Sequence, residues 1–344
     1  NKWSGKHSVI FIACGSSASW IIKNIVYNKG GLHNRTTLEL PLLPFTLREA
    51  KVFLASKHVL LSDDTMTSLY MALGGIPYYL SYVEPGYSAE QIIQSLFFDK
   101  NAPLQGEFSK LFDSLFNNSE AYKELIEITS RKRVGLTQAE ISATARLSSQ
   151  GGNLAEKLEN LCNAGFLQKY HSWGNARLAY YKVIDEYCLF YLHWIKDYSG
   201  IVFPKDYWHI QTQRPSYYSW AGYAFEALCS KHIHEIVRAL RITLVQSLSS
   251  WRYVPKNSEE FGAEIDLLIE RLDNSITLCE IKYTQQPFTI DKNAAEILLR
   301  KISLFKSRTK TNKQIFLALV SAHGMKPTLY SEEIVQGVVT LEDL

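Results

Sequence analysis

Two short apolar runs in the last third of the chain carry charged residues at fixed positions. The first is Gly-Ala-Glu-Ile-Asp-Leu-Leu-Ile at residues 262–269, and the second is Leu-Cys-Glu-Ile-Lys at residues 278–282. Apolar runs of this length predict buried β-strands. Because successive side chains on a strand point to opposite faces, Glu280 and Lys282 should share a face. The pattern therefore predicts adjacent strands that place carboxylates and an ammonium group at neighbouring positions.

These residue types have the chemistry needed to hold a divalent cation beside a phosphodiester. Mg²⁺ prefers hard oxygen ligands, which Asp266 and Glu280 can supply from adjacent strands. Lys282 can position a water molecule and stabilise developing charge. Glu226, in an apolar helical stretch upstream, can help to hold the metal. We therefore expect Glu226, Asp266, Glu280 and Lys282 to be catalytic, and the three carboxylates to bind Mg²⁺ or Mn²⁺. The alternative is an ordinary ion pair between Glu280 and Lys282, because Glu-x-Lys is a common tripeptide.

Composition limits the remaining classes of protein. The 344 residues are enough for two or three domains, and 46% are hydrophobic and 21% charged, as in ordinary globular proteins. No run of about 18 apolar residues predicts a membrane helix, and the first residues do not resemble a signal peptide. The five scattered cysteines contain no Cys-x-x-Cys, which argues against a zinc site and a disulfide framework. We expect a cytoplasmic protein with no membrane partner.

Basic residues are concentrated after the second apolar run. Residues 282–313 contain eight Lys and Arg against two acidic residues. This stretch is either a phosphate-binding flank beside the predicted site or simply a solvated helix face followed by a loop.

The order of predicted elements indicates a multidomain α/β protein. Residues 1–45 begin with a buried-strand run, which suggests a chain that starts partway through an α/β domain. The residues that follow, 46–118, are helical and are broken by Gly74-Gly75 and Pro77. Residues 119–198 predict a winged helix-turn-helix followed by an aromatic helix. Residues 214–344 predict an α/β/α domain: a helix at about 217–240, strands near 242–248, 264–270 and 276–283, a helix near 291–308, and strands near 314–320 and 337–340.

The winged helix is predicted from capping and periodicity. Thr137 with Glu140 forms a capping box at the start of the second helix. The third helix, at about 153–164, precedes two wing strands near 166–170 and 179–184. Asn153, Lys157 and Arg177 are the candidate DNA-binding residues, although Glu156 and Glu159 on the third helix repel phosphate. The module therefore predicts contact with either DNA or protein.

The set formed by Glu226 on a helix, Asp266, and Glu280-x-Lys282 resembles the PD-(D/E)xK nuclease superfamily. Four further segments resemble, in order, the archaeal-type AAA+ ATPases (also found in bacteria) that end in such a nuclease-like domain. Residues 10–17 resemble the sensor-1 strand, 35–45 the following Arg and Pro-Phe segment, 74–80 the lid, and 181–190 the aromatic segment after the winged helix. The resemblance implies an AAA+ remnant at 1–45, a helical lid at 46–118, and a restriction-endonuclease-like fold with a mixed sheet at 214–344.

The resemblance also implies nucleotide chemistry. It assigns Ser16 as sensor 1 and Arg35 as a phosphate-sensing arginine, for which a helix cap and a surface arginine are the alternatives. The chain has no Gly-x-x-x-x-Gly-Lys-Ser/Thr, so we expect ATP binding and hydrolysis, and homo-oligomers formed through the AAA+ core, only in a full-length protein.

The sequence thus predicts the C-terminal part of an ATPase acting on nucleic acid, with DNA as the expected partner and metal-dependent hydrolysis in the last domain. The alternative is a non-catalytic regulatory ATPase whose winged helix and nuclease-like fold are docking modules. The presence of all four predicted site residues favours the nuclease.

Overall fold

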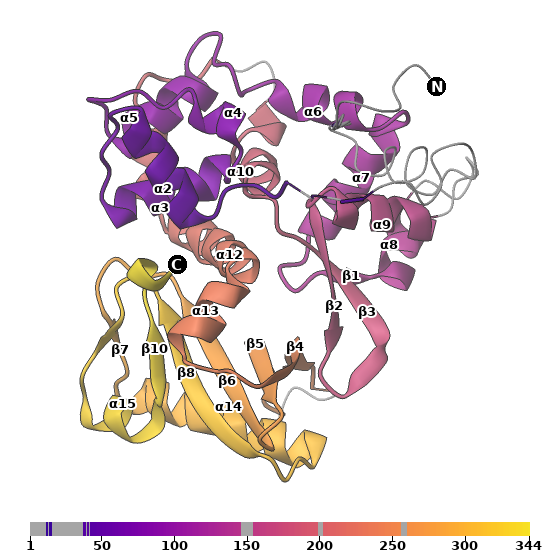
Figure 1. The fold of residues 1–344 in the computed structure, drawn as a ribbon, viewed down its shortest axis with the longest axis vertical. Helices are drawn as coiled ribbons and strands as arrows, with labels where there is room; N and C mark the ends of the chain where they lie inside the picture. The colour runs from indigo at the N-terminus through magenta and orange to yellow at the C-terminus, as the bar shows by residue number, and fades with distance from the viewer. Residues whose placement is uncertain are drawn as a thin grey trace, which may run out of the picture.

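The computed structural model describes residues 42–145, 154–198, 202–255 and 260–344, and residues 12, 14, 15, 37, 38 and 40. These residues form a mixed α/β structure with a helical part, a large mixed sheet, and a long helix, α12, between the two (Figure 1). The predicted α/β class and mixed sheet are confirmed. Ser16, Arg35 and Asn153 lie outside the described residues. Among the helices described, none is both long and apolar enough to span a bilayer.

The first helical part begins where the sequence predicts. Thr46 caps α2 and forms a capping box with Glu49. The predicted break is confirmed, because Gly74 ends α3 with a φ of 64° and Pro77 is the first residue of α4. The elements here are α2 (Leu47–Ser56), α3 (Asp63–Leu73), α4 (Pro77–Leu80), α5 (Ala89–Ile93), the π-helix η2 (Gln94–Phe98) and α6 (Glu107–Leu115).

The next part contains the helices and hairpin predicted for residues 119–198. Thr137 caps α8, and its capping box with Glu140 is present. The short strand β1 pairs with β3, and β3 pairs with β2 across the turn at Trp173 and Gly174. The elements are α7 (Ser119–Ser130), β1 (Leu136–Thr137), α8 (Gln138–Thr144), α9 (Leu154–Asn163), β2 (Leu167–Ser172), β3 (Asn175–Val183), α10 (Glu186–Trp194), η4 (Lys196–Tyr198) and α11 (Tyr207–Thr212).

One sheet crosses the predicted domain boundary, in the strand order β1-β3-β2-β4-β5-β6-β8-β10. The hairpin β2–β3 joins it through one parallel pair, Ser172 with Ser250. Strands β4, β5 and β6 run antiparallel, whereas β6, β8 and β10 run parallel. The later elements are α12 (Pro215–Lys231), α13 (Ile233–Ala239), β4 (Val245–Tyr253), β5 (Ala263–Arg271), β6 (Ser275–Lys282), β7 (Phe288–Thr289), α14 (Lys292–Thr309), β8 (Gln314–Ser321), β9 (Met325–Lys326), α15 (Leu329–Ile334), β10 (Gly337–Val339) and η5 (Leu341–Asp343).

Helices cover both faces of this sheet. Leu267 and Cys279 belong to the core that includes α12, whereas Leu268 and Leu278 belong to the core that includes α14. The alternation of neighbouring residues between two cores is what a sheet buried on both sides requires. The structure therefore has the α/β/α layering predicted for the last part of the chain.

Two predicted boundaries are wrong. The helix predicted to run to Leu240 breaks at His232, where φ is −104° and ψ is 27°, so that α12 and α13 are separate helices. The first strand starts and ends later than predicted, and includes Trp251, which is buried against Phe305 of α14. At both places the chain contacts residues distant in sequence, Leu47 for His232 and Phe305 for Trp251, and sequence periodicity does not report such contacts.

The His232 ring joins α12 to the first helical part. Its Nε2 accepts the N–H of Leu47 at 2.8 Å, and its Nδ1 lies 2.8 Å from the Leu228 carbonyl oxygen. An accepting Nε2 requires a neutral ring with its proton on Nδ1. Burial lowers the pKa of His232, in agreement with a neutral ring.

We predict that His232 makes the fold sensitive to acid. The unfolded chain takes up a proton near pH 6.5 and the folded chain resists it, so stability falls as the pH drops below about 6.5. The variant His232→Gln keeps an acceptor for Leu47 but does not titrate. The difference in Tm between wild type and this variant should shrink between about pH 7.5 and 5.5. His209 is a control with the opposite pH dependence. Its hydrogen bond to Glu90 raises its pKa, so its contribution to stability should be lost as the pH rises. A His232→Gln difference that does not change with pH would contradict the prediction.

Candidate active site

The backbone of β5 is irregular at Asp266. Ser249 of β4 pairs with Leu268, and Trp251 pairs with Ile265, so three steps along β5 match two along β4. At this point β5 therefore has one residue more than β4, which is a β-bulge. Ile265 and Leu267 consequently face opposite cores although they are only two residues apart. A bulge of this kind re-aims the side chains around it, and Asp266 lies within it.

Asp266 lines a pocket between the β2–β3 hairpin, α12 and the sheet. The pocket has a volume of about 80 Å³, enough for several water molecules. Its charged lining residues are Glu226 from α12, Glu264 and Asp266 from β5, and Lys182 from β3. The pocket therefore brings three carboxylates together beside one ammonium group.

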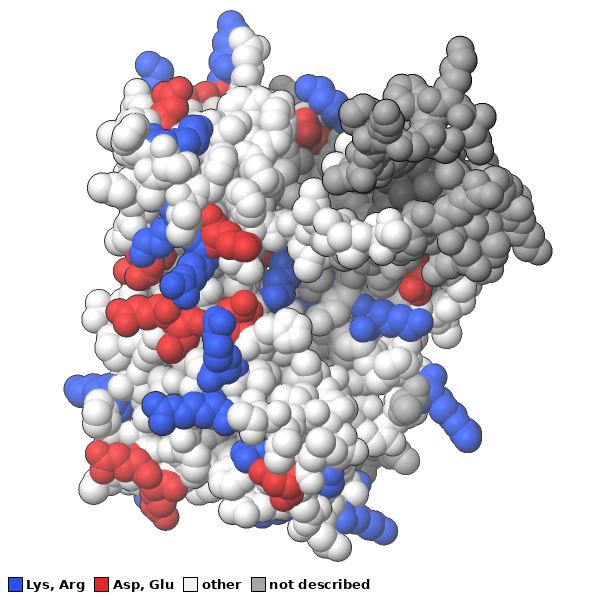
Figure 2. All heavy atoms as spheres, in the orientation of Figure 1, with Lys and Arg blue, Asp and Glu red and all other residues white. Residues whose placement is uncertain are grey.

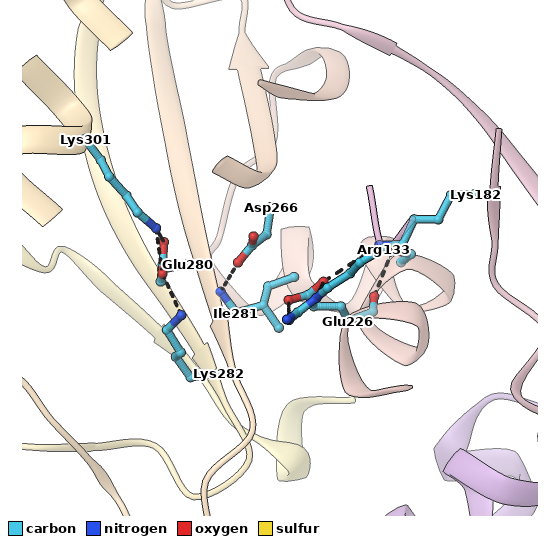
Figure 3. A network of polar contacts seen from close by, with 9 residues as sticks. Arg133, Lys182, Glu226, Asp266, Glu280, Ile281, Lys282 and Lys301 are labelled. Atoms are coloured by element: carbon cyan, nitrogen blue, oxygen red, sulfur yellow. Dashed lines mark hydrogen bonds and ion pairs between the residues drawn. The ribbon is translucent and has the colours of Figure 1, made fainter. Parts of the chain in front are cut away.

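The Asp266 carboxylate has little compensation for its charge. Its Oδ2 accepts the N–H of Ile281 at 2.9 Å (Figure 3). Burial, followed by the negative charges of Glu226 and Glu280, raises the pKa of Asp266 to about 7. The Ile281 N–H and the Lys282 charge only partly oppose this rise. Asp266 is thus the carboxylate that would gain most from a nearby cation.

Glu280 is held by two lysines. The Lys282 Nζ lies 2.8 Å from Glu280 Oε1, and the Lys301 Nζ of α14 donates to both carboxylate oxygens, at 2.9 and 2.8 Å. The first contact confirms that Glu280 and Lys282 share a face. Burial alone would raise the pKa of Glu280, but the two ammonium groups outweigh it and lower that pKa. The same contact with Glu280 raises the pKa of Lys282 in spite of burial.

Glu226 is paired with residues from the part of the chain before α12. The Arg133 guanidinium makes a two-point contact with the Glu226 carboxylate, in which Nε donates at 3.0 Å and the terminal nitrogen reaches the second oxygen (Figure 3). The Lys182 Nζ lies 3.9 Å from Glu226 Oε2. Glu226 itself is only 7% exposed. A buried carboxylate needs such partners to offset the cost of its removal from water.

The predicted metal ligands are neighbours, but they do not form a ready-made metal site. In the described ranges, no group of three or more His, Cys, Asp or Glu side chains is arranged to hold an ion. Three ion pairs already engage two of the carboxylates: Lys282 and Lys301 hold Glu280, and Arg133 holds Glu226. The oxygen donors nevertheless suit Mg²⁺ or Mn²⁺, and a cation near Asp266 would offset both its burial and the neighbouring negative charges that raise its pKa.

Four residues that the sequence analysis did not assign to the site belong to it: Arg133, Lys182, Glu264 and Lys301. Glu264 is within the first apolar run, two residues before Asp266, and strand spacing could have indicated it. Lys301 lies within the basic stretch, but its contact with Glu280 depends on how α14 packs. Arg133 is 93 residues from Glu226, so no local pattern could have paired them.

The predicted nucleic-acid contacts are only partly available on the surface. Lys157 is half-buried on α9 and Arg177 is exposed on β3. Within the basic stretch, Lys313 pairs with Glu270 at 2.7 Å and Arg308 with Glu260 at 3.2 Å. On the face shown in Figure 2, basic and acidic side chains are interleaved. These contacts weaken the interpretation of residues 282–313 as a continuous phosphate-binding flank.

Comparison with known proteins adds no assignment. No protein-family model, curated protein or solved structure shows a significant match to this chain. The resemblance to AAA+ ATPases and to PD-(D/E)xK nucleases therefore rests on the residues described above.

We predict that Asp266→Asn stabilises the protein at neutral and alkaline pH. The folded-state pKa is raised above that of the unfolded chain, so the Asp266 contribution to stability falls as the pH rises from about 4 to about 7. Asn lacks this charge and still offers an oxygen to the Ile281 N–H. Relative to wild type, its free energy of unfolding should increase by roughly 1–3 kcal/mol over that pH interval.

The matched control for this measurement is Glu270→Gln on the same strand. Burial alone would raise the pKa of Glu270, but Lys313 and Ser247 hold it below its ordinary value. Relative to wild type, Glu270→Gln should therefore lose stability as the pH rises toward about 4.5 and then show no further change up to about pH 7. Denaturant unfolding at several pH values checks both variants, and a pH-independent difference for Asp266→Asn would contradict the assignment.

Proposed function

We propose that the last part of this chain, residues 214–344, hydrolyses phosphodiester bonds in DNA with a divalent metal ion, as the C-terminal part of a larger ATPase. The observation that carries the proposal is the placement of Asp266 between Glu226 and Glu280, with its pKa raised to about 7 and Lys282 nearby. Excess carboxylate charge beside a protonated lysine is the arrangement that metal-assisted phosphodiester hydrolysis requires.

The residues divide the work according to their electrostatics. Asp266 and Glu280 would supply hard oxygen ligands, and Glu226, which lines the same pocket as Asp266, would add another once it is free of Arg133. A bound Mg²⁺ or Mn²⁺ would supply Lewis acidity and a water molecule of lowered pKa. Because the pKa of Lys282 is raised, this residue stays protonated, and its role is to orient water and stabilise the charge that develops on phosphorus.

Lys301 fits this division of roles. When Lys282 turns toward a phosphate, Glu280 loses one of its two ammonium partners. Lys301 still contacts both oxygens of Glu280 and keeps the carboxylate ionised. The ATPase part of the proposal has separate support, namely the four resembling segments, and of its residues Ser16 and Arg35 lie outside the described part of the chain.

A non-catalytic docking module is the second candidate, and the closed state of the site favours it. Glu226 is buried and fully engaged by Arg133, and the pocket of about 80 Å³ is too small to enclose a nucleotide. A docking module would bind DNA or protein but would neither bind Mn²⁺ through Asp266 nor cut a phosphodiester.

The two candidates are separated by Lys282→Ala. We expect the wild-type chain to nick or cut DNA with Mn²⁺, and Lys282→Ala to lower the rate at least about 100-fold with an unchanged circular dichroism spectrum. The exposed Lys292 at the start of α14 is the matched control, and Lys292→Ala should cut at the wild-type rate. Equal cleavage by the wild type and Lys282→Ala would reject the role given to Lys282, whereas no cleavage and no Mn²⁺ binding by any of the three proteins would favour the docking module.

A further inference from the structure

We propose that the contact between Arg133 and Glu226 is an autoinhibitory latch, which occupies the carboxylate that a divalent cation would otherwise use. The role of that cation rests on the proposed function, whereas the latch itself rests on the contacts of Arg133. Arg133 lies between α7 and β1, outside residues 214–344, and reaches Glu226 on α12. The part of the chain before α12 therefore contributes a cation to the carboxylate cluster.

The geometry of the contact explains why it competes with a metal ion. A guanidinium that meets a carboxylate at two points occupies both oxygens and fixes their direction. Arg133 does this at Glu226, while Lys182 lies 3.9 Å from one of the same oxygens. An arginine cannot be deprotonated at any ordinary pH, so the contact persists until the side chain moves. While it persists, each oxygen of Glu226 faces the guanidinium, whose positive charge repels a divalent cation.

Arg133 also offsets part of the negative charge of the pocket. The pocket places Glu226, Glu264 and Asp266 together, with Lys182 as its lining cation. Arg133 supplies a second positive charge from the rim. Without Arg133, three clustered carboxylates would face one ammonium group, and the attraction for a divalent cation would rise. The same substitution therefore removes a competitor and increases the local negative potential.

The two partners differ in how easily they can move. The Glu226 side chain is 9% exposed, whereas that of Arg133 is 50% exposed. Rotation of the Arg133 side chain into solvent can therefore open the latch without unfolding a core. A phosphate group offers a guanidinium the same two-point contact as a carboxylate. The backbone of a nucleic acid is thus the chemistry that would draw Arg133 away from Glu226.

The test is Mn²⁺ binding to the full chain, measured by calorimetry for the wild type, Arg133→Gln and Lys132→Gln. Lys132 is the matched control, because it carries the same charge one residue away but pairs with Glu140 at 2.7 Å. We expect Arg133→Gln to bind Mn²⁺ at least about 10-fold more tightly than wild type, which corresponds to about 1.4 kcal/mol. Lys132→Gln should bind within about twofold of wild type. Unchanged affinity in Arg133→Gln overturns the latch.

A second variant covers the case in which Arg133→Gln does not fold. Arg133→Lys keeps the charge but loses the two-point contact, so its Mn²⁺ affinity should lie between those of the wild type and a fully opened latch. Wild-type affinity in Arg133→Lys, when it is the only folded variant, also overturns the proposal. Circular dichroism and thermal melting identify which variants are folded.

Cleavage assays on the same proteins separate this inference from the proposed function. Tighter Mn²⁺ binding by Arg133→Gln without cleavage by any variant supports the latch and rejects the nuclease. If the wild type and Arg133→Gln bind Mn²⁺ with equal affinity and cut DNA at equal rates, the latch is rejected and the nuclease is supported. Absence of Mn²⁺ binding in every variant rejects both.

Discussion

The buried ion pair between Lys231 and Glu186 joins the end of α12 to the start of α10, and the candidate site depends on α12. Glu186 is fully buried at the start of α10, and its partner Lys231 is the last residue of α12. Removing one member of such a pair leaves an uncompensated charge inside the protein, at a cost of about 3–5 kcal/mol. Glu226 lies five residues before Lys231 on the same helix and lines the pocket, so a candidate catalytic carboxylate and this buried ion pair share one helix.

The candidate site is close to electrostatic balance, with its charges supplied by separate parts of the chain. The partners of Glu280 are Lys282 on its own strand and Lys301 on α14. The partner of Glu226 is Arg133, which comes from the part of the chain before α12. Among these three carboxylates, Asp266 has the strongly raised pKa, because it is buried and because Glu226 and Glu280 add negative charge beside it. The arrangement pairs Glu226 and Glu280 with cations and leaves Asp266 as the position where positive charge is lacking.

Local patterns in the sequence predicted the parts of the structure that local physics decides. The capping box of Thr137, the helix break at Gly74, and the shared face of Glu280 and Lys282 all follow from spacing within a few residues. The break at His232 and the bulge at Asp266 do not, because one depends on the Leu47 amide and the other on the register of β4. The contact of Arg133 with Glu226 is still harder to predict from local patterns, because it exists only when two distant parts of the chain have packed together.

The junction between β2 and β4 has a consequence for the behaviour of the chain in solution. Only one residue pair, Ser172 with Ser250, joins these strands within the described residues, whereas β4 pairs with β5 along most of its length. Strand edges with unpaired amide and carbonyl groups are templates on which other chains can add. The β2–β3 hairpin shields this edge of β4 by proximity more than by hydrogen bonding. Any change that displaces the β2–β3 hairpin would therefore expose the edge of β4 to strand addition by a second molecule. Displacement of the hairpin would then be accompanied by self-association.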